Sequence, residues 1–128
     1  MSVTRSRLLA VAALLVAPAV FADGKADIEN GQTIVAQRCG FCHAVSRESG
    51  GPMAGPSMMG LIGRKAAGQP DFAMYSPALK GYSVTWSVET LDEYLASPLT
   101  KVPGTTMPVG LPDKKERGDV IAYLATLK

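Results

Sequence analysis

The sequence of 128 residues is poor in several features that common protein classes require. Two cysteines and one histidine are too few for a structural zinc site of four Cys or His ligands, unless a carboxylate completes the set. There is no long basic stretch, and only 6% of the residues are aromatic, which makes nucleic acid a poor candidate partner. No strand pattern, internal repeat or low-complexity tract is recognisable. The sequence therefore favours a small all-α protein.

Long apolar runs are also lacking. The longest, residues 8–20, is too short for a comfortable membrane span. Two arginines precede this run and the small residue Ala22 follows it, an arrangement typical of a secretory signal peptide. We therefore expect residues 1–22 to be a cleaved signal peptide for export to the periplasm. Residues 23–128 would then form one domain with no stable membrane span.

A large excess of one charge is missing as well. The chain has 13 basic and 11 acidic residues. Cleavage after Ala22 would remove Arg5 and Arg7, so that the mature chain would be close to neutral. We therefore expect little electrostatic steering of partners, and encounter rates that respond weakly to salt.

What the sequence does contain is a concentrated motif. Both cysteines and the histidine lie in Cys39-Gly40-Phe41-Cys42-His43, the pattern C-x-x-C-H. Two thiols at this spacing can add to the vinyl groups of haem, while the adjacent imidazole offers a nitrogen to the iron. We therefore expect one haem c, covalently bound through Cys39 and Cys42, with His43 as an iron ligand.

Three other uses of these residues remain open at this point. A disulfide is possible in an exported chain, but it would leave His43 without a role. A thioredoxin-like dithiol needs a preceding strand and a βαβ context, whereas residues 27–38 predict a helix. A metal site would need a further ligand from a carboxylate.

Apolar periodicity and capping residues predict three main helices, over about residues 27–39, 87–97 and 113–128. Ser87 can cap the second helix, which Pro98 is expected to end, and Asp113 with Glu116 resembles a capping box for the third.

The remaining chain is expected to be mostly irregular. A short helical turn is expected over residues 76–81, and residues 44–75 are rich in Gly, Pro and Ser without clear periodicity. So long a loop is unusual in a compact domain. It becomes reasonable when it packs against a large prosthetic group, so we expect long loops wrapped around a covalent haem.

The second axial position of the iron needs a ligand other than histidine, because the chain has only one. Met107 lies between Pro103 and Pro108, and prolines limit the freedom of the unligated loop. Met58 and Met59 are better explained as core residues. We therefore expect Met107 to be the second iron ligand.

Taken together, these segments resemble class I cytochrome c, the family of the mitochondrial protein and its soluble bacterial relatives. The resemblance covers about Ile28 to Leu127 and depends on the order and spacing of short segments. These are Cys39–His43, Gly55–Ser57, Gly60–Lys65, Tyr82–Trp86, Glu89–Leu91, Glu93–Leu95, Pro103–Met107 and Ile121–Leu124.

The resemblance implies roles at matching positions. Met107 would be the distal ligand, and the Pro56 carbonyl would accept the other imidazole N–H of His43. Tyr94 would lie near the methionine sulfur. The residues implied to hydrogen-bond or neutralise the haem propionates are Arg64, Tyr75 and Trp86, with Thr105 assisting. The first and last helices would cross where Gly31 and Val35 meet Val120 and Tyr123.

The resemblance further implies a monomeric, soluble one-electron carrier that is not an enzyme. Its iron would cycle between Fe(III) and Fe(II). Its partners would be redox proteins, such as a membrane-bound quinol-oxidising complex, a terminal oxidase, a reductase or a dehydrogenase. The alternative is a haem sensor or peroxidase-like protein in which a small molecule displaces Met107. The chain has no second histidine that could act as an acid or base in peroxidase-like chemistry.

Overall fold

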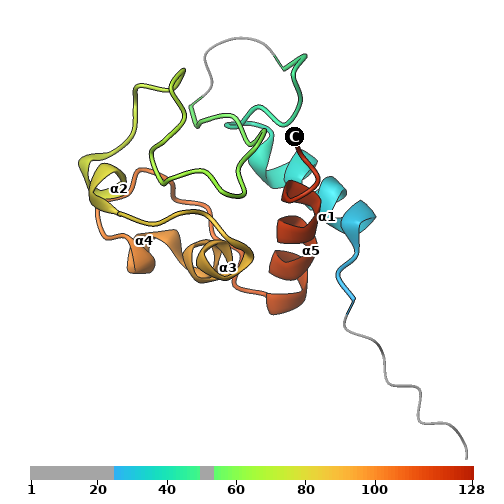
Figure 1. Ribbon diagram of the computed structural model, residues 1–128. Helices are drawn as coiled ribbons and strands as arrows, with labels where there is room; N and C mark the ends of the chain where they lie inside the picture. Colours follow the sequence, from blue (N-terminus) through green and yellow to red (C-terminus); the bar gives the residue numbers. More distant parts are fainter. Residues whose placement is uncertain (1–24, 50–53) are drawn as a thin grey trace, which may run out of the picture.

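The computed structural model describes residues 25–49 and 54–128, so the expected signal peptide lies outside the described residues. The helices are α1 (Ile28–Ile34), α2 (Pro77–Gly81), α3 (Val88–Ala96), α4 (Pro98–Lys101) and α5 (Lys114–Leu124), with a π-helical turn, η1 (Val35–Cys39), directly after α1 (Figure 1). Within the described ranges the only β pairing is an isolated bridge between Lys65 and Thr85. The prediction of an all-α fold is confirmed. None of the described helices is long and apolar enough to cross a membrane.

Local capping explains where the main helices begin. At α3, the Ser87 side chain accepts from the backbone N–H of Thr90 and the Thr90 hydroxyl accepts from the backbone N–H of Ser87, a complete capping box. At α5, Asp113 accepts from the backbone N–H of Glu116. The Glu116 side chain instead pairs with Arg38 at 2.9 Å, so only half of the expected box is formed there.

Three elements differ from the sequence-based prediction. The last helix, expected to continue to residue 128, ends at Leu124. The first helix does not continue as an α-helix to Cys39, because the N–H of Gly40 bonds to the carbonyl of Val35 at 2.8 Å and widens the last turn. The second helix ends before Pro98 as expected, but Pro98 then begins α4. Proline is well suited to the first position of a helix, where its missing N–H costs no intrahelical bond.

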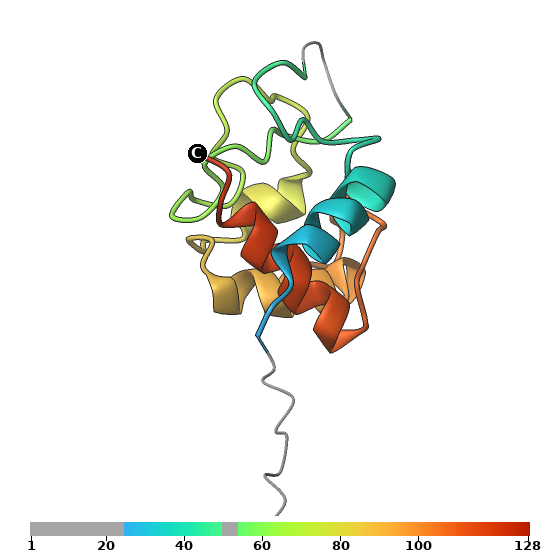
Figure 2. The same ribbon diagram turned by 90° about the vertical axis from the view of Figure 1, so that its right-hand side faces the viewer.

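The core is built around the crossing of α1 and α5, which Figure 2 shows packed against each other. A Cβ on Gly31 would lie 2.5 Å from the backbone carbon of Asp119, closer still to its carbonyl oxygen, and 3.1 Å from Cβ of Tyr123. Only glycine therefore permits this approach. Val35 and Val120, also expected at the crossing, are both 1% exposed.

A buried carboxylate also ties α1 to α5. Asp119 is 0% exposed and accepts from the backbone N–H of Asp27 at 2.8 Å, from the side-chain amide of Asn30 at 2.8 Å and from Lys115 Nζ at 2.7 Å. These donors, with Lys115 first, lower the pKa of Asp119 from 3.8 to about 2. The ionised form is thus the one that the fold stabilises.

The Asp119→Asn variant is expected to lower the free energy of unfolding at pH 7 by about 2 kcal/mol, because a charged acceptor of several hydrogen bonds is lost. The pKa of Asp119 is depressed in the folded state, so its contribution is full above about pH 4 and is lost as the pH falls towards 2. The difference between wild type and variant should therefore shrink in urea titrations at pH 3. Asp71→Asn, at an exposed position, is the control. An equal loss of stability in Asp71→Asn would contradict a special stabilising role for the buried Asp119 carboxylate.

Candidate haem-binding site

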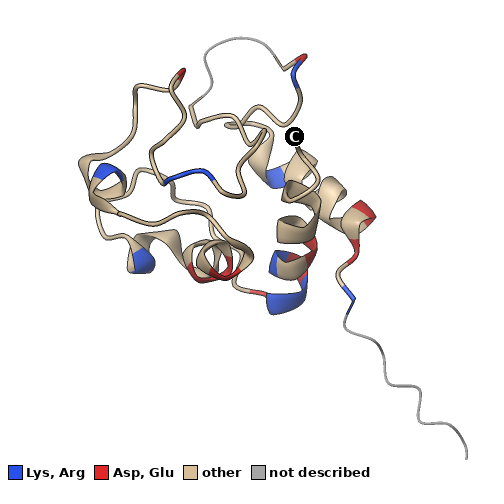
Figure 3. Cartoon of the chain, in the orientation of Figure 1, with Lys and Arg blue, Asp and Glu red and all other residues tan. Residues whose placement is uncertain are grey.

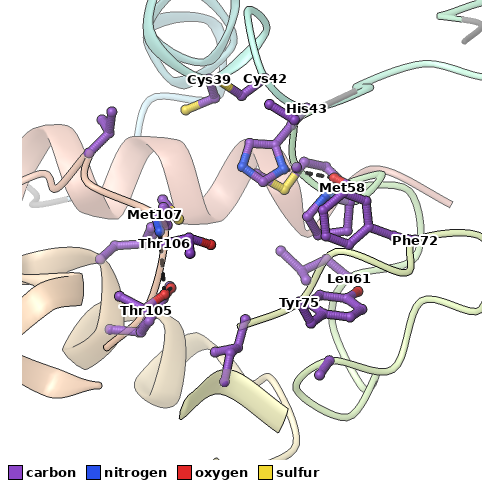
Figure 4. A pocket seen from close by; sticks show the side chains of 18 of the residues that line it. Cys39, Cys42, His43, Met58, Leu61, Phe72, Tyr75, Thr105, Thr106 and Met107 are labelled. Atoms are coloured by element: carbon purple, nitrogen blue, oxygen red, sulfur yellow. Dashed lines mark hydrogen bonds between the residues drawn. The ribbon is translucent and has the colours of Figure 1, made fainter. Parts of the chain in front are cut away.

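A cavity lies among η1, the loops that follow it, α3 and the loop after α4 (Figure 4). The structure brings to its lining all ten residues that the sequence singled out: Cys39, Cys42, His43, Pro56, Arg64, Tyr75, Trp86, Tyr94, Thr105 and Met107. They come from segments that lie far apart in the sequence, so only the fold unites them. Most of the remaining lining is apolar, including Leu61, Leu91, Leu95 and Leu124.

The C-x-x-C-H segment forms a tight turn at the end of η1. The N–H groups of Cys42 and His43 both bond to the carbonyl of Cys39, at 3.0 and 2.9 Å. Both thiols are free of disulfide bonds; Cys39 is half-buried and Cys42 is exposed. Burial raises the pKa of Cys39. The turn presents both sulfurs and the imidazole to one cavity, as a group attached at two points requires.

The His43 ring is held in one orientation. Nδ1 lies 2.7 Å from the carbonyl oxygen of Pro56, and because a carbonyl can only accept, the proton belongs on Nδ1. The ring also packs on Gly55, where a Cβ would lie 2.6 Å from Nδ1 and 2.7 Å from Nε2. Burial, opposed by the Pro56 bond and aided by the charge of Arg64, lowers the pKa of His43. A neutral imidazole therefore presents the lone pair of Nε2.

Met107 lies on a different part of the cavity lining from His43 (Figure 4). Its loop turns at Gly104, whose φ of +92° favours glycine. The Thr105 hydroxyl is 3.0 Å from the Tyr94 hydroxyl and accepts from the N–H of Met107 at 3.4 Å. These contacts fix the backbone from which the thioether extends into the cavity.

Arg64 is a half-buried cation at the cavity wall. It donates to the carbonyls of Ser57 and Met59, at 2.8 and 3.0 Å, and to the side-chain oxygen of Gln69 at 2.7 Å. All three acceptors are neutral, and within the described residues no carboxylate forms an ion pair with Arg64. The wall can therefore receive an anionic substituent of a bound group.

Gln69 was not singled out from the sequence. Its N–H donates to the Tyr75 hydroxyl at 3.1 Å, so it joins Arg64 and Tyr75 in one polar cluster. A lone glutamine in a loop without periodicity gives no sequence signal for this role. Only the folded path of the loop brings Gln69 within hydrogen-bonding distance of Arg64 and Tyr75.

Aromatic side chains close another side of the cavity. Trp86 and Tyr94 have ring centroids 5.1 Å apart, and Tyr82 lies 6.4 Å from Tyr94. Met58, expected to be a core residue, is buried and also lines the cavity. Apolar walls, one unpaired cation and a fixed imidazole fit a large flat apolar group that carries anionic substituents and a metal.

Comparisons with known proteins identify the family of this chain. Residues 28–128 match the family model described as Cytochrome c. Cytochrome c of Tetrahymena pyriformis is 43% identical over 102 residues, covering 79% of this chain and 89% of that protein. Cytochrome c2 of Rhodomicrobium vannielii is 41% identical over 116 residues, covering 90% of this chain and 89% of that protein.

A solved structure, that of cytochrome cH from Methylobacterium extorquens, superposes with a TM-score of 0.68 at 40% identity. The superposition covers 78% of this chain and 98% of the cytochrome cH chain. The matched family region contains the whole cavity described above, including both cysteines. The chain therefore belongs to the cytochrome c family, and it binds haem c covalently through Cys39 and Cys42.

Proposed function

We propose that this electron-carrying haem protein holds its iron between His43 and Met107. The observation that carries the proposal is the orientation of the His43 ring. Its Nδ1 lies 2.7 Å from the Pro56 carbonyl oxygen, so that the lone pair of Nε2 remains available to bind iron. Bound haem supplies an iron that accepts and releases one electron. The chain's own residues hold that group, orient it and keep water away from it.

Met107 is the proposed second ligand because of its loop. Two prolines flank the loop, and the bonds from Thr105 to Tyr94 and to the N–H of Met107 restrain it. A restrained ligand loses little entropy on binding. A thioether also favours the reduced iron more than a second imidazole does, which raises the reduction potential.

The remaining residues would control charge and water. The Arg64 guanidinium, with Gln69 and Tyr75, would receive the anionic substituents of the group. The apolar walls would exclude water. Fewer water molecules would then have to reorient when the iron gains or loses an electron, so the reorganisation energy would be smaller. With both axial positions filled, there would be no open site for a substrate, so we propose that the protein is not an enzyme.

We further propose export to the periplasm. The supporting observation is the N-terminal sequence, in which residues 1–22 have the pattern of a cleaved signal peptide. The mature monomer would exchange electrons with redox proteins there. Mass spectrometry of the periplasmic fraction should find a chain that begins at Asp23 and carries one haem.

The Met107→Ala variant is expected to lose the weak far-red absorption band of thioether-ligated ferric haem and to bind carbon monoxide rapidly when reduced. The reason is that an axial position would be open. Wild type should keep the band and bind carbon monoxide slowly and incompletely at neutral pH. Visible spectra and stopped-flow mixing provide both measurements.

Met74→Ala is the matched control, because Met74 is another thioether in the cavity lining. It should keep the band. Loss of the band in Met74→Ala but not in Met107→Ala would reassign the ligand. Rapid, complete binding of carbon monoxide to wild type would favour a sensor or peroxidase-like function instead.

A further inference from the structure

Arg117 on α5 is a charged side chain that the fold buries almost completely, at 7% exposure. Its guanidinium donates to both oxygens of the Asp92 carboxylate on α3, from Nε at 2.7 Å and from Nη2 at 3.3 Å. Figure 3 shows acidic residues on α3 and basic residues at the start of α5. A cation is costly to bury unless its charge and its donors are satisfied. The two-point ion pair with Asp92 supplies the opposite charge and fixes the plane of the guanidinium.

The remaining donor group of Arg117 holds the end of the loop that carries Met107. Nη1 donates to the backbone carbonyl of Leu111 at 2.9 Å and to that of Pro112 at 3.1 Å. Leu111 is itself 2% exposed, and among the described residues no other side chain donates to either carbonyl. A buried carbonyl that loses its donor destabilises the structure by more than the bond alone is worth. The position of the end of the loop therefore depends on Arg117.

Helix α3 holds this loop on both sides of Met107. Before Met107, the Thr105 hydroxyl lies 3.0 Å from the Tyr94 hydroxyl. After Met107, the N–H of Leu111 donates to the carbonyl of Leu95 at 2.7 Å. A large movement of Met107 away from the cavity therefore requires one of these two anchors to open.

We propose that Arg117 is a positioning residue for Met107. By pairing with Asp92 and holding the carbonyl of Leu111, it keeps the loop closed and so limits how often the thioether leaves the iron. The proposal rests on the proposed ligation of the iron by Met107. Arg117 and Asp92 lie outside the cavity lining that the described residues form, so both act through the loop rather than on the bound group.

The consequence of this anchor is a choice between two functions. A loop that stays closed keeps both axial positions filled, as an electron carrier requires. A loop that opens often would leave one position to a small molecule, as a sensor or peroxidase-like protein requires. The ion pair between Arg117 and Asp92 would thus favour the electron carrier.

The rate at which reduced holoprotein binds saturating carbon monoxide tests the proposal, because the gas can bind only after Met107 has left. Asp92→Asn removes the charge but keeps the side-chain shape, and it should raise this limiting rate by about tenfold. Arg117→Gln should raise it by about a hundredfold, since the buried carbonyl of Leu111 also loses its donor. Arg117→Lys keeps the charge but not the planar fork, so it should bring the rate back to within about tenfold of wild type. Stopped-flow mixing measures all three rates.

Asp119→Asn is the control for a general loss of stability. Asp119 also lies on α5, but its bonds to Asp27 and Asn30 join that helix to α1 and not to the loop. The variant should therefore leave the limiting rate within about twofold of wild type, although its free energy of unfolding is lower. An acceleration as large as that of Arg117→Gln would overturn the positioning role. If Arg117→Gln yields no holoprotein, Asp92→Asn decides, because the Asp92 side chain is 40% exposed and its removal disturbs the core less.

Hydrogen exchange in the reduced holoprotein provides a readout without an added ligand. Exchange of the Leu111 N–H should accelerate in Asp92→Asn by about the same factor as carbon monoxide binding. The N–H of Gly40, bonded within η1 to the carbonyl of Val35, should change by less than about twofold. Unchanged exchange at Leu111 would overturn the proposal.

The far-red band of the oxidised protein separates this proposal from the one on which it rests. Wild type without the band would reject ligation by Met107. Wild type with a normal band, together with Arg117→Gln and Asp92→Asn variants that bind carbon monoxide no faster, would reject only the positioning role of Arg117.

Discussion

The double variant Cys39→Ala, Cys42→Ala is expected to lose all haem when the protein is denatured and extracted with acidified organic solvent. Wild type should keep one haem under the same treatment, because two thioether bonds survive unfolding whereas axial ligation and apolar contacts do not. Intact-mass spectrometry gives the result directly: wild type should exceed the bare polypeptide by one haem, and the variant should match it.

The double variant should also be much less stable as a folded protein. The cavity wall is largely apolar, and a chain of this size buries a limited core without a prosthetic group. Loss of the bound group therefore exposes leucine and aromatic side chains to water. The single variants Cys39→Ala and Cys42→Ala are the controls, since each retains one thiol for attachment. Haem that remains on the double variant after denaturation would contradict covalent binding at these cysteines.

The Gly31→Ala variant is expected to lower the free energy of unfolding by about 3 kcal/mol, because the added methyl group meets backbone atoms that cannot rotate away. The new Cβ would lie 2.5 Å from the carbonyl carbon of Asp119. The helices α1 and α5 must therefore separate, which also disturbs the hydrogen bonds that Asp119 receives from Asp27 and Asn30. Urea unfolding of the holoprotein measures the change.

Gly118→Ala is a close control for this prediction. Gly118 lies within α5, and a Cβ there would meet nothing within 4 Å. Both substitutions gain the same helix propensity, so Gly118→Ala should stabilise the protein by up to about 1 kcal/mol. The difference between the two variants isolates the contact at the helix crossing. Similar effects in both would mean that the crossing is not tightly packed at Gly31.

Much of the secondary structure follows from local signals. Ser87 and Asp113 begin helices because their side chains accept hydrogen bonds from N–H groups three residues later, an interaction complete within one turn. The boundary at Pro98 was only partly predictable. A proline ends one helix or begins another according to the path of the chain on either side, and that path depends on what the chain packs against.

The sequence by itself determined the chemistry of haem attachment, because both thiols and the imidazole lie within five consecutive residues. Through a resemblance along most of the chain, it also indicated which distant residues would share the haem site. Only the tertiary structure decided the burial of Asp119, the neutral partners of Arg64 and the exposure of Phe41. Short motifs act through bonds between near neighbours, whereas burial and charge pairing depend on segments that lie far apart in the sequence and meet only in the folded chain.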